Sequence, residues 1–326
     1  MRTFHLGIGA TWAFVYPDGY FKFNPNVKNG QYKDYMINSH GFRGSEFNIK
    51  KAPGVRRIVA LGDSATFGAK NKDSETYSYL LQQLLDSSPL HSHYEVINAG
   101  IPYIRSDQVR NLFEKEVLAM EPDCVILYGG WNDAQYAVYE ANWFTSAFYW
   151  LMYNSELIAW MHLNATKAMI MNPEPSDKVM QKISPATLAQ CAHRATSRYD
   201  ENLRSIHRAC LERNIQLIVM AAPTRSVNYT HTTSEFLQAT YDRRRQMMQE
   251  KLDREGGLIL LNALFYVHGF VKDRLFKIAD EEHIPLVNAI PELDHHPEFQ
   301  VTHVHISKEG NEILARLLND KIRSIL

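Results

Sequence analysis

The sequence lacks several features that mark particular classes of protein. It has three cysteines in 326 residues. Cys124, Cys191 and Cys210 show no metal-ligand spacing and cannot all pair, so we expect ordinary buried thiols. No stretch has the roughly 18 uninterrupted apolar residues that a membrane span needs. The formal net charge is −1, so no surplus of charge would attract nucleic acid or anionic lipid. We therefore expect no disulfide scaffold, no transmembrane segment and no nucleic-acid partner.

The composition is typical of a soluble globular protein, with 45% hydrophobic and 22% charged residues. A chain of this length can bury a substantial core, as one large domain or two small ones. The basic run Arg243–Arg245 is short and lies in a helical stretch, so we expect it on a solvent-exposed helix face. The start of the chain is largely apolar after Arg2 but has no small-residue cleavage site, so we expect no signal peptide.

Residues 1–54 differ in pattern from the rest of the chain. They are rich in Tyr, Asn, Gly and Phe, have no helical period and contain Asn-Gly and His-Gly turn signals. We therefore expect an N-terminal extension, irregular or a β-hairpin, that packs on a main domain of residues 55–326. Arg43 within the extension has two open roles: it pairs with an acid of the main domain, or it contacts a substrate carboxylate.

From Val55 onward, strand-like apolar runs alternate with amphipathic helical stretches. The expected strands are Arg57–Leu61, Tyr94–Asn98, Cys124–Tyr128, Ile215–Ala221 and Pro285–Asn288. The expected helices include Tyr77–Leu85, Leu188–Glu212 and Val267–His283. Repeated β-α units of this kind predict an α/β fold, with a mostly parallel sheet covered by helices on both faces.

Polar, glycine-containing segments follow the first three expected strands. They read GDS (62–64), NAGIPY (98–103) and YGGWND (128–133). Because ligands bind at the carboxyl ends of the strands in parallel sheets, these segments predict a functional site along one edge of the sheet.

An insertion interrupts the alternation at about residues 134–185. Its segment Trp143–Trp160 contains seven aromatic residues. Phe144, Ala147, Phe148 and Leu151 follow the spacing of one helix face. Two interpretations stay open: these aromatic residues pack in the core, or they form a lid or acyl-binding wall beside the GGWND segment.

Three motifs in the order GDS, GGWND and HVHISKEGN (303–311) resemble those of the SGNH (GDSL) hydrolases, a superfamily of bacterial-type esterases, lipases and acyl hydrolases. The resemblance extends to GDSATFG, to INSHGFRGSE upstream and to YDENLRSIHRACLERNIQLIVMAAP downstream. It covers the chain from about Tyr16 to its end. It implies a flavodoxin-like three-layer α/β/α fold and a hydrolase that needs no metal or organic cofactor.

The resemblance also implies roles for particular residues. Ser64 would be the nucleophile that forms an acyl-enzyme, and His305 would be the general base that a hydroxyl nucleophile needs. The oxyanion hole would consist of the Asn132 side-chain amide and the backbone N–H groups of Ser64 and Tyr103. Donors aimed at a developing negative oxygen are worth about 10²–10³ in rate each.

Two positions depart from the family pattern. The second block usually reads N-x-G-x-x-G, and here Tyr103 occupies the last glycine position, where glycine permits close approach and unusual φ angles. The last block usually reads Asp-x-x-His, and here Thr302 replaces the Asp that orients the base. In another hydrolase the loss of that carboxylate costs about 10⁴ in kcat. A Thr hydroxyl can accept a hydrogen bond but brings no charge.

Three alternatives for the support of His305 stay open. A carboxylate from the segment PELDHHPEF, namely Asp294, Glu292 or Glu298, would replace the missing Asp. A backbone carbonyl would orient the ring in a Ser–His dyad. Alternatively, the protein has lost catalysis.

Other titratable residues near the motifs receive structural interpretations. His303 is a competing base that would point to the side opposite His305 in extended backbone. His295 and His296 are adjacent rather than at helical spacing, which favours a solvated loop over a zinc site. Asp63 and Asp133 are expected to bond backbone groups of their own turns.

The expected function is that of a serine esterase acting on a small-molecule acyl ester, either lipid-like or an acylated sugar. Trp131, Tyr103 and Trp143 are candidates for the substrate pocket. Two rivals stay open: a non-catalytic binding protein, which Tyr103 and Thr302 favour, and an acyltransferase to a sugar hydroxyl. The oligomeric state stays open. So does the compartment, which is the bacterial cytoplasm, or the periplasm or exterior if an upstream signal is missing from this chain.

Overall fold

Five parallel strands form the central sheet of the protein. The computed structural model describes residues 14–15, 20, 22–23, 25, 35–87, 93–141, 182–225 and 234–325. The strand order is β4-β3-β5-β6-β7, and every neighbouring pair is parallel. The strands are β3 (Val55–Gly62), β4 (His93–Gly100), β5 (Cys124–Tyr128), β6 (Gln216–Ala221) and β7 (Leu286–Asn288). The predicted parallel sheet is confirmed, and each predicted strand ends within two residues of the observed one.

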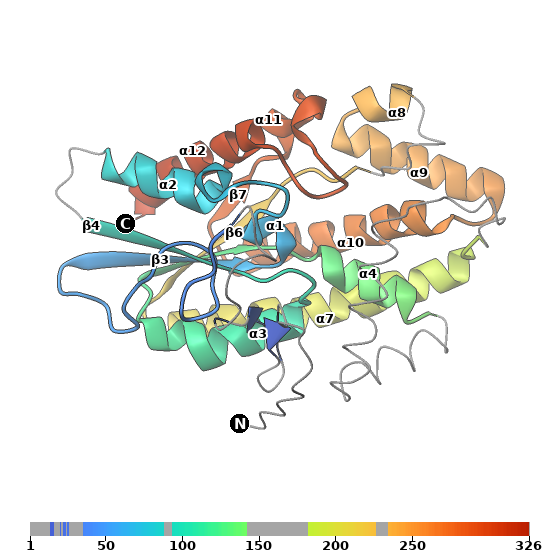
Figure 1. Ribbon diagram of the computed structural model, residues 1–326. Helices are drawn as coiled ribbons and strands as arrows, with labels where there is room; N and C mark the ends of the chain where they lie inside the picture. The colour runs from blue at the N-terminus through green and yellow to red at the C-terminus, as the bar shows by residue number, and fades with distance from the viewer. Residues whose placement is uncertain are drawn as a thin grey trace, which may run out of the picture.

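Helices cover both faces of the sheet, as the predicted three-layer fold requires (Figure 1). One face carries α2 (Tyr77–Asp86), α11 (Ile290–Asp294) and α12 (Lys308–Ile325). The other face carries α3 (Ser106–Leu112), α4 (Trp131–Tyr139), α7 (Pro185–Leu211) and α10 (Leu260–Glu281). The remaining α-helices that the structure describes are α1 (Ser64–Phe67), α8 (Ser234–Gln238) and α9 (Tyr241–Glu255).

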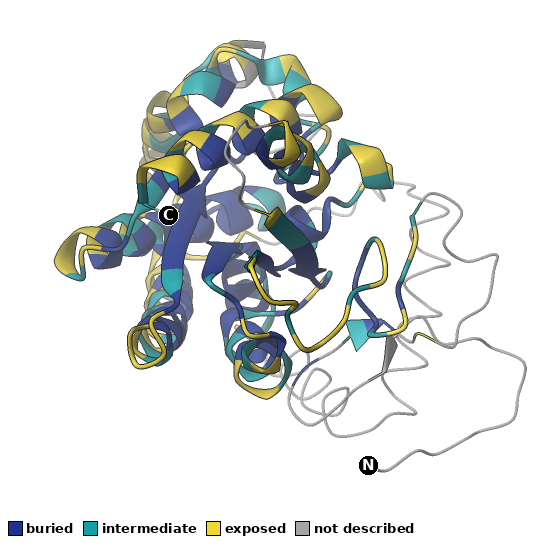
Figure 2. Cartoon of the chain, turned by 90° about the vertical axis from the view of Figure 1, so that its left-hand side faces the viewer, coloured by how far each residue is buried: buried dark blue, intermediate teal, exposed yellow. Residues whose placement is uncertain are grey.

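Successive strand residues point into two hydrophobic clusters, one on each side of the sheet. Ile58 and Ile126 pack with the helices α2 and α12, whereas Val59 and Val125 pack with α3 and α7. All five residues of β5 are buried, and Figure 2 shows the sheet buried while the outer faces of the helices are exposed. Burial on both faces explains why these strands read as continuous apolar runs rather than as alternating patterns.

The described part of the N-terminal extension contacts the main sheet. A short hairpin pairs β1 (Phe14–Val15) with β2 (Lys22–Phe23) in antiparallel register. The buried Phe23 ring stacks on the ring of Phe67, with centroids 5.0 Å apart. A single antiparallel bridge between Arg43 and Asn98 joins the extension to β4.

The expected insertion begins later in the chain than residue 134. Residues 134–139 complete helix α4, and the aromatic segment Trp143–Trp160 lies outside the described residues.

The expectation of a solvent-exposed Arg244 is wrong, because this side chain is fully buried. Its Nη2 lies 2.9 Å from the carboxylate of Asp294 on α11. That carboxylate offsets the cost of burying a charge, so α9 can turn Arg244 inward.

The cysteines match the prediction of ordinary buried thiols. All three are buried and form no disulfide. Burial raises the pKa of the Cys210 thiol to about 12, which keeps it protonated at neutral pH. Within the described residues, no helix is both long enough and apolar enough to cross a membrane.

The packing of α1 against β4 leads to a first prediction. A Cβ at Gly100 would lie 2.2 Å from the backbone nitrogen of Phe67, whereas a Cβ at Gly54 would meet nothing within 4 Å. We expect Gly100→Ala to lower the free energy of unfolding by about 3 kcal/mol, because backbone atoms on both sides must move. Gly54→Ala should cost about 1 kcal/mol, from its positive φ alone. Urea denaturation measures both, and equal losses would contradict the close packing of α1.

Candidate active site

The register of the sheet brings three predicted segments to one level. Gly62 at the end of β3 is paired with Gly100 of β4 on one side and with Tyr128 of β5 on the other. The GDS, NAGIPY and GGWND motifs therefore leave the sheet side by side at its carboxyl edge. This is the edge at which parallel sheets bind ligands.

Ser64 is the first residue of α1, a single helical turn directly after β3. Asp63 caps this turn, because its Oδ1 accepts the backbone N–H of Ala65 at 2.9 Å. The bond confirms that Asp63 serves its own turn. The Thr66 hydroxyl donates to the carbonyl of Tyr128 at 2.7 Å and joins α1 to β5. These two bonds fix the backbone that carries the Ser64 hydroxyl.

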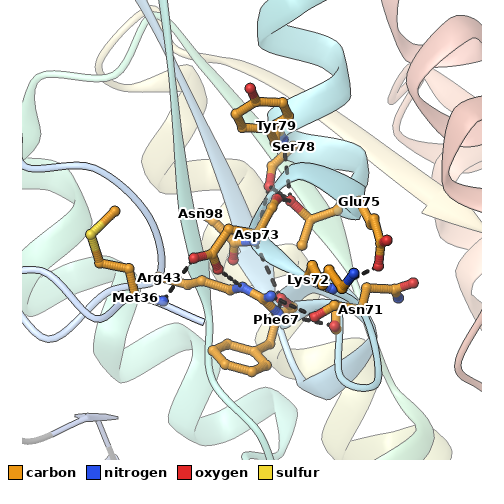
Figure 3. Close-up of polar contacts among 12 residues, drawn as sticks. Met36, Arg43, Phe67, Asn71, Lys72, Asp73, Glu75, Ser78, Tyr79 and Asn98 are labelled. Atoms are coloured by element: carbon orange, nitrogen blue, oxygen red, sulfur yellow. Dashed lines mark hydrogen bonds and ion pairs between the residues drawn. The ribbon is translucent and has the colours of Figure 1, made fainter. Parts of the chain in front are cut away.

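Arg43 reaches from the N-terminal extension to the carboxyl end of α1 (Figure 3). Its Nη1 donates to the carbonyls of Phe67 (2.9 Å) and Gly68 (3.0 Å), and its Nη2 donates to the carbonyl of Asn71 (2.7 Å). Its Nε lies 2.8 Å from Oδ1 of Asp73. Of the two roles expected for Arg43, the ion pair with an acid of the main domain is confirmed. The cation also satisfies the last carbonyls of α1.

The segment after α1 is bonded in turn to the loop that carries His305. Asn71 Nδ2 donates to the carbonyl of Ile306 at 2.9 Å, next to His305. Asn311 Nδ2 on α12 donates to the carbonyl of Glu75 at 3.0 Å. Both asparagines lie more than 230 residues from their partners, and nothing in the local sequence signals these contacts. They place the Ser64 segment and the His305 loop relative to one another.

The structure brings His305 to Ser64. The Nε2 atom of His305 lies 2.9 Å from Ser64 Oγ, and its Nδ1 lies 2.8 Å from Thr302 Oγ1. The Thr302 hydroxyl oxygen also accepts the backbone N–H of His305 at 3.1 Å and that of Val304 at 3.4 Å. A neutral imidazole with its proton on Nδ1 donates to Thr302 and accepts from Ser64. This is the arrangement that a general base requires.

The electrostatics around His305 favour the neutral ring. Burial lowers the pKa of His305 to about 4, and His303 and Lys70 add smaller effects in the same direction. His305 is therefore uncharged and ready to accept a proton at pH 7. A carboxylate beside the ring would raise this pKa, and the hydroxyl of Thr302 does not.

Of the alternatives left open for the support of His305, the carboxylate of Asp294 is contradicted by its contacts. Its Oδ1 pairs with Arg244 at 2.9 Å, and its Oδ2 accepts the backbone N–H of Tyr241 at 2.6 Å. This carboxylate therefore serves the start of α9. The other two carboxylates of the segment also pair elsewhere, Glu292 with Arg316 and Glu298 with His296. Among the described residues, Thr302 is the one that forms a hydrogen bond with Nδ1 of His305.

Asn132 and Trp131 form the first turn of α4. Asn132 Nδ2 donates to the carbonyl of Ile104 at 2.9 Å, which fixes the amide. Since an amide nitrogen carries two hydrogens, one N–H remains for a second acceptor. Trp131 is buried, and its ring lies 4.4 Å from the ring of His303. Trp143, the third candidate for the pocket, lies outside the described residues.

The expectation that His303 points to the side opposite His305 is wrong, because side chains two residues apart share one face even in extended backbone. Residues 301–304 form bends, and the two imidazole rings lie 6.3 Å apart. Burial lowers the pKa of His303 to about 4. His296 Nδ1 lies 3.1 Å from Glu298 on an exposed turn. Within the described ranges, no group of three or more His, Cys, Asp or Glu residues could bind a metal ion.

Asp133 departs from its expected role, because it bonds a distant segment rather than its own turn. Its Oδ1 accepts the hydroxyl of Ser106 at 2.6 Å, and its Oδ2 accepts the backbone N–H of Ser106 at 3.0 Å. Asn202 Nδ2 on α7 donates to the same hydroxyl at 3.1 Å. Burial raises the pKa of Asp133 to about 6 and that of Asp63 to about 7. The Ser106 contacts tie α3, α4 and α7 together beneath the site loops.

The chain is similar to known proteins in sequence and in fold. A model of the GDSL-like Lipase/Acylhydrolase family matches residues 60–313. No curated protein sequence matches the chain. A lipase/acylhydrolase structure from Enterococcus faecalis is 19% identical, with a TM-score of 0.43, over 82% of this chain and 96% of that one. An acetylxylan esterase from Geobacillus stearothermophilus is 17% identical, with a TM-score of 0.46, over 82% and 94%. The acetyl xylan esterase AlAXEase is 15% identical, with a TM-score of 0.45, over 83% and 100%.

Tyr103 leads to a second prediction. It takes the left-handed conformation, with φ of 70°, and its side chain is half exposed. A side chain in this region costs about 1–2 kcal/mol, which is the reason for glycine at this position of the family pattern. We expect Tyr103→Gly to raise the free energy of unfolding by up to about 1 kcal/mol, after the entropy cost of glycine. The matched variant Tyr103→Ala should not, because it keeps the strain. Thermal and urea unfolding measure the free energy of unfolding of both variants. An increase in both Tyr103→Gly and Tyr103→Ala would contradict backbone strain at this position.

Proposed function

The chain belongs to the GDSL-like lipase/acylhydrolase family, and on that premise we propose that it is a serine esterase that forms an acyl-enzyme on Ser64. The observation that carries the proposal is the distance of 2.9 Å between Ser64 Oγ and His305 Nε2. A serine hydroxyl is a weak nucleophile alone and needs a base within hydrogen-bond reach. A small-molecule acyl ester is the substrate class that this chemistry requires.

The proposed reaction has two halves. Ser64 Oγ attacks the ester carbonyl as its proton passes to Nε2 of His305, and a tetrahedral intermediate with a negative oxygen forms. The imidazolium returns the proton to the leaving alcohol, the carbon–oxygen bond breaks, and the acyl group remains on Ser64. Water then attacks the acyl-enzyme while His305 takes its proton, and the collapse of the second intermediate returns a proton to Ser64 and releases the acid.

The negative oxygen of each intermediate needs donors. We assign this role to the side-chain amide of Asn132 and to the backbone N–H groups of Ser64 and Tyr103. The bond from Asn132 to the Ile104 carbonyl supports the assignment, because it holds the amide in one orientation before the substrate arrives. Trp131 and Tyr103 are the described candidates for the wall of the substrate pocket.

Thr302 takes the position of the acid in this proposal. Its hydroxyl oxygen orients His305 through Nδ1, so the ring presents Nε2 to Ser64. It does not stabilise the imidazolium by charge, so proton abstraction from Ser64 is less favourable than with a carboxylate. The low pKa of His305, about 4, also makes its imidazolium a stronger acid toward the leaving alcohol.

We also propose that residues 55–326 are the hydrolase domain and that the extension of residues 1–54 supplies Arg43 to it.

Labelling with a fluorescent fluorophosphonate tests the proposal. We expect rapid labelling of the wild-type protein, none in Ser64→Ala, and labelling slowed by about 10²- to 10⁴-fold in His305→Ala, which removes the general base. Ser87→Ala, at the end of α2 and away from the motifs, is the matched control and should label like the wild type. Turnover of p-nitrophenyl esters from acetyl to octanoyl then gives the acyl preference.

The outcomes separate the proposal from its rival. Folded wild-type protein that does not label, with circular dichroism unchanged among the variants, would reject an activated serine and favour a binding protein with this fold. Equal labelling of the wild type and Ser64→Ala would place the nucleophile elsewhere.

A further inference from the structure

The helix that carries Ser64 is too short to hold its own position. α1 has four residues, and the N–H groups of Gly68 and Ala69 at its end both donate to one carbonyl, that of Ser64, at 3.1 Å. An isolated helix of fewer than about 12 residues is not stable in water, because the first turn costs more entropy than its bonds return. Contacts from other segments must therefore fix the direction of the Ser64 hydroxyl.

Two side chains from other segments bind the carboxyl end of α1. Asn98 Nδ2 on β4 donates to the carbonyl of Thr66 at 3.1 Å. Arg43 Nη1, from the N-terminal extension, donates to the carbonyls of Phe67 at 2.9 Å and Gly68 at 3.0 Å. The last carbonyls of a helix have no partner within the helix. Arg43 thus supplies two of the bonds that place this end of α1.

The guanidinium of Arg43 is itself held in one orientation. The side chain is 2% exposed, and the guanidinium carbon lies 5.0 Å from the centre of the Tyr35 ring and 4.7 Å from that of Phe67. Asp73 balances the charge, with Oδ1 at 2.8 Å from Nε, and its Oδ2 accepts the backbone N–H of Met36 at 2.8 Å. A planar, delocalised cation bonded at its edge and stacked on rings has little freedom to rotate.

The same guanidinium reaches the His305 loop through one further residue. Arg43 Nη2 donates to the carbonyl of Asn71 at 2.7 Å (Figure 3). The Asn71 side chain is buried, and its Nδ2 donates to the carbonyl of Ile306 at 2.9 Å. Ile306 directly follows His305, whose Nε2 lies 2.9 Å from Ser64 Oγ. Bonds from one side chain therefore lead to both ends of the Ser64–His305 contact.

We propose that Arg43 is a positioning residue for the Ser64–His305 pair, acting on Ser64 through the end of α1 and on His305 through Asn71. The inference rests on the proposed esterase function, because it names a residue outside the hydrolase motifs on which that reaction depends. The hydrogen bonds of Arg43 to described residues end on backbone carbonyls and on Asp73, not on the reacting side chains. Its effect is to hold Oγ and Nε2 within reach before the substrate binds, and a misplacement of about 1 Å can cost about 10²-fold in rate.

Arg43→Lys tests the proposal, because an ammonium keeps the charge beside Asp73 but lacks the planar fork that bonds three carbonyls. We expect kcat for p-nitrophenyl acetate to fall by about 10- to 100-fold. The value of kcat/KM should fall by the same factor, since the binding of the ester itself is not affected. Arg43→Ala should be slower still and should recover part of its rate in guanidinium chloride far below denaturing concentrations.

Lys22→Met is the matched control. Lys22 also joins the extension to the main domain, since its Nζ lies 2.9 Å from Glu116. Glu116 belongs to the helical segment Phe113–Val117 and not to the segments that carry Ser64 or His305. We expect kcat of this variant to equal that of the wild type. A wild-type kcat in folded Arg43→Lys, or an equal loss in Lys22→Met, would overturn the inference.

Asn71→Ala tests the route to His305. It removes the bond to Ile306 but keeps the backbone carbonyl that Arg43 binds. We expect the double variant Arg43→Lys/Asn71→Ala to be slowed by less than the product of the two single effects, because both changes loosen the same connection. Slowing equal to that product would overturn the route through Asn71.

Hydrogen exchange keeps this inference separate from the proposed function. If the wild type hydrolyses no ester and does not label, the esterase proposal fails, and exchange measured by mass spectrometry still tests the placement. We expect amides of residues 64–71 and 301–306 to exchange about 5- to 10-fold faster in Arg43→Lys, as when one buried hydrogen bond is lost. Lys22→Met should leave both segments unchanged. Unchanged exchange of residues 301–306 in Arg43→Lys, or equal acceleration throughout the chain, would overturn the inference.

Discussion

The hydrogen bond between Ser64 Oγ and His305 Nε2 joins residues that are 241 positions apart in the chain. Each end of this bond rests on a different part of the fold: Ser64 on a one-turn helix after β3, and His305 on a loop before α12. A displacement of 1 Å at either end would break a contact of this length. The hydrogen bonds of Arg43, Asn71 and Asn311 place one segment relative to the other.

Arg43 and Asn71 carry most of that placement. Arg43 donates to three carbonyls between α1 and Asn71, and Asn71 donates to the carbonyl beside His305. A side chain from the N-terminal extension thus acts on both members of the candidate pair without touching either. Gly100 also helps to place Ser64, because its lack of a side chain lets α1 approach β4. The extension belongs to the support of the site as much as the sheet does.

Sequence patterns predicted the sheet and the candidate pair but not their supports. The buried strands were readable because apolar runs ending in polar, glycine-containing segments are typical of parallel sheets, and the three motifs placed Ser64, Asn132 and His305. Asp133 and Arg244 were misassigned because each is satisfied by a partner distant in sequence, which local turn and helix rules do not represent. Its place in the sequence makes Asp294 one of the alternatives for the support of His305, yet its carboxylate binds the start of α9. The sequence shows that Thr302 departs from the family pattern, but its contact with Nδ1 of His305 depends on the bends at 301–304.

The central claim is that His305 acts as a neutral base oriented by the hydroxyl of Thr302. The pH dependence of kcat/KM for the wild type and Thr302→Asp tests it most directly, with circular dichroism at each pH to exclude unfolding. Because His305 must be unprotonated and its pKa is about 4, the wild-type rate should fall only as the pH drops through about 4. A carboxylate facing Nδ1 favours the imidazolium, so in Thr302→Asp the fall should move up by about 1–3 pH units, with a higher rate at neutral pH. A wild-type fall near the ordinary histidine pKa, unmoved by the substitution, would contradict the account.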